Sequence, residues 1–291
     1  MTARLCILTP DPNDPSVEGR WPEVFARMAA PLQALGATVE PRPWTETGDL
    51  SGFDLILPLM VWGNYRAVDR WLQAVDVWDE TGLPVLNPPS VLRWNVDKIY
   101  LQRLKDHGAP IPPTVWAEAG DHAAVEAARR DHGWDAVVIK PRRSGGSYRT
   151  TRLTAGEAPV FEPFPGPAMV QPYLPGVESV GEVSLVFFNG DYSHAVRKVA
   201  RAGDFRVQPD WGGHVSRAEP DADEHAAARA ALAAVEEPLL YARVDLVRDL
   251  DHKPVVMELE LLEPDLYLGE EAAAQERFAR AVLTRCGGSG R

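Results

Sequence analysis

Three carboxylates in the C-terminal part of the chain could bind a metal ion. Asp245 lies on one predicted strand, and Glu258 and Glu260 lie on the next one. Alternate residues of a strand face the same side, so we expect these three side chains and that of Arg243 on one sheet face. Carboxylates grouped in this way repel one another unless a cation lies between them. Hard oxygen ligands suit Mg²⁺ that also holds phosphates. The alternative is a solvated face of charges, which the apolar residues between them disfavour.

A second group of residues could hold a nucleotide. An apolar β-branched run, 136–139, places Lys140 at its end, and a short loop of small residues follows. The amides of such a loop can approach phosphate oxygens closely. Its residues are Ser144, Gly145, Gly146 and Ser147. The loop is not a Walker loop, because no Gly-Lys-Ser/Thr follows it. Taken separately, Lys140 could be a surface lysine and the loop a plain turn.

Four further cations are candidates for an anionic ligand. Lys98 is predicted near the start of a helix, where a cation opposes the helix dipole and is therefore unusual. Arg197 and Lys198 end a predicted strand, and Arg206 lies in the loop after it. These three could bind phosphate or a substrate carboxylate, or they could be solvated side chains.

The overall composition is that of a globular protein. The chain has 291 residues and a formal net charge of −12, which favours two or three lobes and argues against a broad nucleic-acid surface. The two cysteines lie near opposite ends, so neither a disulfide framework nor a structural zinc site is expected. No apolar run approaches the ~20 residues needed to cross a bilayer, and no signal-peptide pattern is present. We therefore expect a cytoplasmic protein without a membrane partner.

The first part of the chain alternates strands and helices, which favours a parallel sheet covered on both faces. Strands are predicted at 4–9, 38–39 and 55–60, and helices at 22–35 and 65–80. The turn at Trp62, Gly63 and Asn64 either faces a substrate or reflects a packed tryptophan. A break follows at 87–89, so we expect a first lobe over residues 1–89.

The remainder reads as a small α+β lobe, 90–170, and a strand-rich lobe, 171–291. Helices are predicted at 97–107 and at 122–131, where Asp121 is the expected cap. Asn189-Gly190 between two apolar runs is a strong hairpin signal. The predicted elements of the last lobe are strands at 180–188, 192–199, 242–247 and 254–262, helices at 222–235 and 270–285, and a frayed tail at 287–291.

With both groups of residues in view, the chain resembles the ATP-grasp superfamily. This superfamily includes D-alanine–D-alanine ligase, glutathione synthetase and ribosomal-protein glutamate ligases. The resemblance covers about residues 90–285, and the first lobe is compatible with the family's N-terminal domain. It implies an ATP-grasp fold: an N-terminal parallel-sheet lobe, a central α+β lobe and a C-terminal antiparallel-sheet lobe, in the classes α/β and α+β.

The resemblance also implies roles for individual residues. Lys98 and Lys140 resemble the two lysines that contact nucleotide phosphates, and Ser144 to Ser147 resemble the flexible phosphate-covering loop. Gln171, Tyr173 and Leu174 would border adenine, and Glu178 would bind the ribose hydroxyls.

In the last lobe, Lys198 resembles a later phosphate-binding lysine, with Arg197 as its competitor, and Arg206 is a further catalytic candidate. Arg243 and Asp245 resemble the family's Arg-x-Asp pair. Glu258 and Glu260 occupy the places of its Glu-x-Asn metal ligands, so Asp245, Glu258 and Glu260 would bind Mg²⁺, or alternatively Mn²⁺. The sequence departs from the family at two of these positions, where Glu260 replaces asparagine and Gln171 replaces glutamate.

The implied activity is an ATP-dependent C–N ligation. A carboxylate of a small amino-acid-like substrate would attack the γ-phosphorus, and an amine would then displace phosphate from the acyl phosphate. Within the superfamily the chain is most similar to small ligases of secondary metabolism that make antibiotics, such as those that cyclise O-ureido-D-serine to D-cycloserine. A homodimer is compatible with this resemblance. The alternatives are an ATP-dependent phosphotransferase and a non-catalytic nucleotide-binding module.

Overall fold

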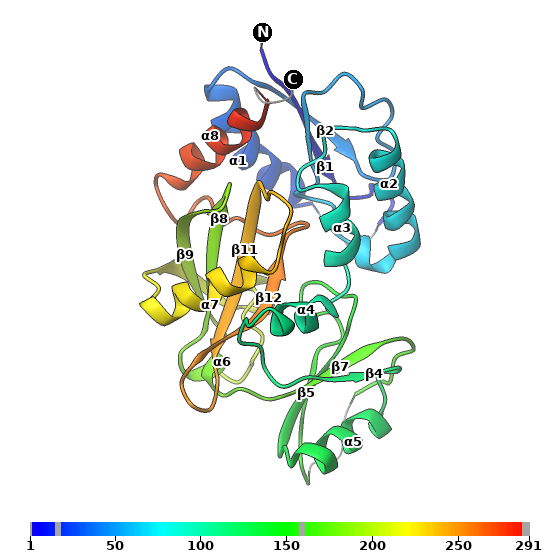
Figure 1. Ribbon diagram of the computed structural model, residues 1–291, viewed down its shortest axis with the longest axis vertical. Coiled ribbons are helices and arrows are strands. Elements are labelled where there is room, and N and C mark those ends of the chain that lie inside the picture. The colour runs from blue at the N-terminus through cyan, green and yellow to red at the C-terminus, as the bar shows by residue number, and fades with distance from the viewer. Residues whose placement is uncertain (1, 15–18, 157–160, 287–291) are drawn as a thin grey trace.

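Three β-sheets follow one another along the long axis of the molecule (Figure 1). The computed structural model describes residues 2–14, 19–156 and 161–286. The tail that was predicted to fray, 287–291, lies outside the described residues. None of the helices that the structure describes is long and apolar enough to span a membrane.

The first sheet is parallel, with strand order β2-β1-β3, as the alternation of strands and helices predicts. Its elements are β1 (Arg4–Thr9), α1 (Trp21–Ala34), β2 (Thr38–Pro43), β3 (Leu55–Leu57), the 3-10 turn η1 (Asn64–Arg66) and α2 (Val68–Glu80). Alternate residues of β1 supply two cores. Leu5 and Ile7 pack in the core that includes residues of α1, whereas Cys6 and Leu8 pack in the core that includes Trp71 of α2. Both faces of the sheet are therefore covered.

The second sheet is antiparallel, with order β4-β7-β5-β6. Its part of the chain contains α3 (Pro89–Asn95), α4 (Tyr100–Asp106), β4 (Val115–Ala117), α5 (His122–His132), β5 (Ala136–Pro141), β6 (Thr151–Thr154) and β7 (Ala168–Pro172). Asp121 caps α5 as predicted, because its Oδ1 accepts a hydrogen bond from the amide of Ala124 at 2.8 Å. The predicted helix at 97–107 begins later than expected, so Lys98 lies just before α4.

The third sheet has five antiparallel strands in the order β10-β9-β8-β11-β12. Its elements are α6 (Gly176–Ser179), β8 (Glu182–Phe188), β9 (Asp191–Val199), the 3-10 turn η2 (Pro209–Trp211), β10 (His214–Ala218), α7 (Ala222–Ala233), β11 (Tyr241–Arg248), β12 (Pro254–Glu260) and α8 (Ala274–Cys286). The predicted hairpin is confirmed: β8 and β9 pair, and Asn189 and Gly190 both have the positive φ that a tight hairpin turn requires.

The C-terminal helix connects the first and third sheets. α8 lies beside α1 at the first sheet (Figure 1), and its residues Phe278 and Val282 share one core with β1 and with Val186 of β8. The boundary expected at 170/171 falls inside β7, and the strand as a whole pairs within the second sheet. We therefore propose that the C-terminal lobe begins after Pro172.

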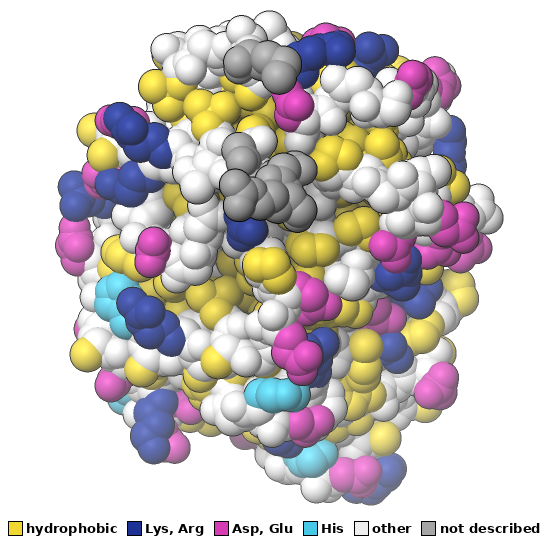
Figure 2. All heavy atoms as spheres, turned by 45° about the horizontal axis from the view of Figure 1, so that its top comes forward, with side chains coloured by type: hydrophobic (Ala, Val, Ile, Leu, Met, Phe, Trp, Pro, Cys, Tyr) yellow, Lys and Arg dark blue, Asp and Glu magenta, His cyan; other side chains and the backbone are white. Residues whose placement is uncertain are grey.

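The surface carries both charge signs in mixture. On the face shown in Figure 2, Lys and Arg side chains lie among Asp and Glu side chains, and the described residues form no continuous basic surface there.

Candidate active site

One cleft of about 810 Å³ takes residues from all three parts of the chain. Its walls include the Trp62–Arg66 turn of the first lobe, the end of β5 and the loop after it, and the facing surface of β11 and β12. All the predicted site residues line this cleft except Glu178 and Arg197, the competitor of Lys198. The two groups of residues that the sequence singled out therefore share one cavity.

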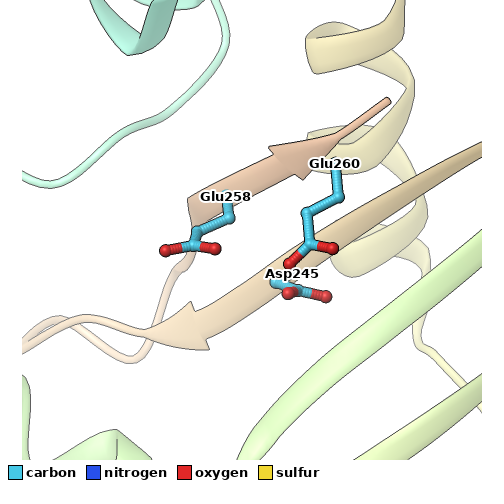
Figure 3. A group of neighbouring side chains, drawn as sticks. All are labelled: Asp245, Glu258 and Glu260. Atoms are coloured by element: carbon cyan, nitrogen blue, oxygen red, sulfur yellow. The ribbon is translucent and has the colours of Figure 1, made fainter. Parts of the chain in front are cut away.

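The three predicted metal-binding carboxylates project from two neighbouring strands to the same side (Figure 3). Asp245 of β11 pairs in register with Glu258 of β12, and Arg243 pairs with Glu260. Carboxylate oxygens of Asp245, Glu258 and Glu260 all lie within 4.8 Å of one another. The register shifts directly after Asp245, an irregularity of the kind that re-aims side chains next to active sites.

Arg243 neutralises part of this acidic group. Its Nε and Nη2 donate to Oδ1 and Oδ2 of Asp245, both at 2.9 Å, and Nη2 also contacts Glu260. Burial alone would raise the pKa of Asp245, but Arg243 and Lys198 outweigh it and hold that pKa below its usual range. Burial raises the pKa of Glu260 to about 7, and the neighbouring carboxylates of Asp245 and Glu258 add to this effect.

Two lysines of the second lobe meet at Glu258. The Nζ atoms of Lys98 and Lys140 lie 3.6 Å and 3.5 Å from the same oxygen, Oε1 of Glu258. Burial would raise the pKa of Glu258, but the two lysines outweigh it and lower that pKa. Burial is also the main cause that lowers the pKa of Lys140. Nζ of Lys98 additionally donates to the carbonyl of Ser144 at 2.6 Å, which ties this lysine to the small-residue loop.

The structure separates the two competitors at the end of β9. The side chain of Lys198 is buried in the cleft, where it contacts Glu182 and lies 3.3 Å from Oδ2 of Asp245. Burial would lower the pKa of Lys198, but these two carboxylates raise it above its ordinary value. Arg197 does not line the cleft and instead donates to the carbonyl of Val180, because neighbouring residues of a strand face opposite sides.

The small-residue loop meets a second loop across the cleft. Oγ of Ser147 donates to Oε1 of Gln208 at 2.8 Å, and Nε1 of Trp211 donates to the carbonyl of Gly146 at 3.4 Å. Arg206 lies on this second loop, with its guanidinium 3.5 Å from the ring centre of Trp211. Nε and Nη2 of Arg206 donate hydrogen bonds to Oδ1 and Oδ2 of Asp204, which hold the guanidinium in place.

The segment predicted to border adenine lies along another wall. Gln171, Tyr173 and Leu174 line the cleft, and Nε2 of Gln171 donates to Oγ1 of Thr114 at 3.0 Å. Glu178 is exposed and contacts Arg152 and the hydroxyl of Tyr173. The structure thus places the predicted ribose ligand at the outer edge of this segment rather than on the wall of the cleft.

Glu182 and Glu263 are acidic residues of the cleft that were not singled out from the sequence. Glu182 contacts Lys198, and the side chain of Glu263 accepts a hydrogen bond from Asn64. The position of Glu182 could have been found, because β8 and β9 form the predicted hairpin and Glu182 pairs with Lys198 in its register. Glu263 carries no such local signal, since its partner is 199 residues away.

The donor set of the cleft suits a nucleotide together with a divalent cation. Three carboxylates offer hard oxygen atoms, and the lysines and the small-residue loop offer ammonium and amide hydrogens on the same cavity. Chemistry on a nucleotide that is held with a divalent cation does not require a side-chain nucleophile. Such a donor set could position a phosphorylated ligand against a metal ion.

Comparisons with known proteins agree with this geometry. A family model described as D-cycloserine synthetase DcsG, N-terminal domain, matches residues 6–87. The chain is 32% identical over 286 residues to the cycloserine biosynthesis protein DcsG of Streptomyces lavendulae, with 87% of this chain and 90% of that protein covered. It is 29% identical over 250 residues to a glutathione synthetase of Prochlorococcus marinus strain MIT 9313, with 78% of each covered.

Solved structures show the same fold. The crystal structure of D-cycloserine synthetase DcsG matches with a TM-score of 0.83 at 27% identity, over 98% of this chain and 100% of that one. A D-alanine–D-alanine ligase from Bacillus anthracis matches with a TM-score of 0.72 at 17% identity, over 98% and 97% of the two chains, which is a likeness of fold alone.

Fold, cleft and likeness together define the class of protein: the chain belongs to the ATP-grasp ligase family. It is an enzyme that uses ATP to join a carboxylate to an amine, as the sequence predicted.

Proposed function

We propose that the enzyme activates the carboxylate of a small amino acid and joins it to a nitrogen of the same molecule, as in D-cycloserine formation. The observation that carries this proposal is the 32% identity to the cycloserine biosynthesis protein across 87% of the chain. The cleft supports it, because the first-lobe turn at Trp62–Arg66 lines the same cavity as the three carboxylates, so a small substrate could bind between them.

We further propose how the residues divide the work. Asp245, Glu258 and Glu260 would hold Mg²⁺, whose charge favours transfer of the γ-phosphoryl group. Lys98 and Lys140, released from Glu258 when a metal takes that carboxylate, would bind phosphate oxygens. Gln171, Tyr173 and Leu174 would border the adenine.

Three cations would act on the reacting groups. Arg243 lies beside Asp245 and Glu260, where it would stabilise the charge that develops on the substrate carboxylate. Lys198 would stay protonated between Glu182 and Asp245, and it would hold Asp245, a proposed metal ligand, in place. Arg206, on the loop that meets Gly146 and Ser147, would help to exclude water from the acyl phosphate.

The chemistry on the substrate needs no covalent enzyme intermediate. An oxygen of the substrate carboxylate would attack the γ-phosphorus as ADP leaves, giving an acyl phosphate. The amine nitrogen would then bond to the carbonyl carbon as phosphate leaves with the C–O electron pair. The closed cleft would favour this second step over hydrolysis.

Product analysis tests the proposal. Incubation with ATP, Mg²⁺ and O-ureido-D-serine is expected to yield ADP, phosphate and D-cycloserine, with the carbamoyl group of the ureido nitrogen removed by water and released as CO₂ and ammonia. Mass spectrometry detects the products, and a panel of D- and L-amino acids serves as comparison. A phosphorylated substrate without a new C–N bond would indicate a phosphotransferase instead. Nucleotide binding without ADP formation across the whole panel would contradict the proposal altogether.

A further inference from the structure

Glu263 is a half-buried acid in the cleft, and its second carboxylate oxygen has no hydrogen-bond partner among the described residues. It lies three residues after Glu260, where the chain leaves β12, and it lines the cavity. Its Oε1 accepts a hydrogen bond from Nδ2 of Asn64 at 2.6 Å. Its Oε2 is buried, and among residues 2–14, 19–156 and 161–286 no group donates a hydrogen bond to it.

Asn64 holds this carboxyl from the first lobe. Asn64 is only 3% exposed, and its Nδ2 also donates to the carbonyl of Val61 at 3.0 Å, so both its amide hydrogens are used. The turn that carries it depends on Gly63, whose φ is +83° and at which a Cβ would lie 2.4 Å from Oδ2 of Asp14. The side chain of Asn64 is therefore fixed, and it fixes one oxygen of Glu263.

The surroundings of Glu263 favour a positive ligand group. Burial raises the pKa of Glu263 to about 8 and the negative charge of Glu260 adds to this, whereas the hydrogen bond from Asn64 and the positive charge of Lys98 oppose it. A buried acceptor without a donor is costly. A cation that enters the cleft near Glu263 would satisfy this oxygen and stabilise the ionised carboxylate.

We propose that Glu263 binds the ammonium group of the amino-acid substrate, with Asn64 as the positioning residue. Glu263 lines the cavity, so an ammonium group that enters the cleft can approach its carboxylate while Asn64 keeps its hydrogen bond to Oε1. The site recognises a primary ammonium, so it selects amino acids over simple carboxylic acids. The identity of the amino acid rests on the proposed function, whereas the recognition of an ammonium rests on Glu263 and Asn64 alone.

Direct binding measurements test this proposal without requiring turnover. Calorimetric titrations would use O-ureido-D-serine and its analogue without the α-amino group, each with Mg²⁺ and a non-hydrolysable ATP analogue present. Wild type is expected to prefer the amino compound. Glu263→Gln keeps the acceptor for Asn64 but loses the charge, so its affinity for the amino compound should fall about 10- to 100-fold, the equivalent of one charge-assisted hydrogen bond.

Affinity for the analogue without the amino group is expected to change by less than about threefold, because that compound has no group for Glu263. Glu270→Gln is the matched control, since Glu270 is an exposed acid of the same segment that does not line the cleft. Asn64→Ala should weaken binding of the amino compound in the same direction as Glu263→Gln, while affinity for the nucleotide analogue stays at the wild-type value.

Each outcome decides the matter. The proposal is overturned if wild type shows no preference for the amino compound, or if Glu263→Gln keeps the preference while its melting temperature falls, which would indicate a structural role. Formation of D-cycloserine by an enzyme without this preference would overturn the role of Glu263 and leave the proposed function standing. Binding that depends on Glu263, without any ADP formation, would support the role of Glu263 and overturn the proposed function.

Discussion

Asp245 and Glu258 lie directly opposite each other on β11 and β12, and each is neutralised from a different part of the chain. Arg243 and Lys198 of the third sheet contact Asp245. Lys98 and Lys140 of the second lobe contact Glu258. Like charges at facing positions destabilise a ladder. Their presence together on the wall of a cleft therefore indicates a site kept for a ligand rather than for stability.

Loss of either member of the ion pair between Lys140 and Glu258 is expected to stop ATP turnover. Lys140→Ala removes a cation from the predicted phosphate site, and Glu258→Gln removes a predicted metal ligand, so each should lower the rate of ADP release at least ~100-fold. Both variants should keep the wild-type circular dichroism spectrum. Lys105→Ala, at an exposed position of α4, and Asp251→Asn, in the exposed β11–β12 turn, are the controls. Normal turnover by either site variant would place the active site elsewhere.

Substitutions of Lys198 and of Arg197 should lower the free energy of unfolding by very different amounts. Lys198→Met leaves Glu182 and Asp245 buried without their shared cation, so the free energy of unfolding should fall by about 3–5 kcal/mol. Arg197→Ala removes a partly exposed side chain on the other side of β9 and should cost within about 1 kcal/mol. Urea unfolding followed by fluorescence measures both values, and equal losses would contradict the assignment of Lys198 to the cleft.

Activity is expected to require a divalent cation. Dialysis against EDTA should reduce ADP release to background, and Mg²⁺ should restore it, with Mn²⁺ as an effective substitute because both suit oxygen ligands. The carboxylates of Asp245, Glu258 and Glu260 supply those ligands in the proposed site. Full activity after metal removal would show that the acidic group has another purpose.

Stability should fall below neutral pH through His194. This residue is buried on β9 of the third sheet, where its Nε2 lies 2.9 Å from the carbonyl oxygen of Leu266 and its Nδ1 lies 2.9 Å from Oγ of Ser193. Burial lowers the pKa of His194, and the hydrogen bond to Leu266 offsets this only in part. As the pH falls, His194 therefore binds a proton in the unfolded chain before it does so in the folded protein. Its contribution to stability is complete above about pH 6.5 and declines as the pH falls below that value.

His194→Gln tests this expectation. The plot of unfolding free energy against pH should be less steep in the variant between pH 6.5 and 5, by up to ~1.4 kcal/mol per pH unit, the value for one proton. His214→Gln, at an exposed histidine, should leave the wild-type slope. Parallel curves for wild type and His194→Gln would show that His194 does not titrate differently in the two states.

The local signals in the sequence were sufficient to predict the strands that carry the site. The alternation of Arg243 with Asp245 and of Glu258 with Glu260 put all four on one sheet face, and the pairing of β11 with β12 confirms it. The hairpin at Asn189 follows from residues that tolerate positive φ. Such features depend only on neighbours in the chain.

Features set by tertiary contacts were harder to predict. The short edge strands β6 and β10 are polar and partly exposed, so their apolar pattern is weak, and they are defined by pairing with β5 and β9. Lys98 precedes α4 because its amide donates to the carbonyl of Arg142, 44 positions later in the chain. Glu263 is recognisable only once Asn64 has been brought to it by folding.

The most direct test of the central claim is to locate metal and phosphates in a crystal of this enzyme. Crystals grown with Mn²⁺ and a non-hydrolysable ATP analogue would be measured at a wavelength where manganese scatters anomalously. We expect the anomalous peak between the carboxylates of Asp245, Glu258 and Glu260, with the nucleotide phosphates against Lys140. A peak on another surface, with this cleft empty, would contradict the assignment of the active site.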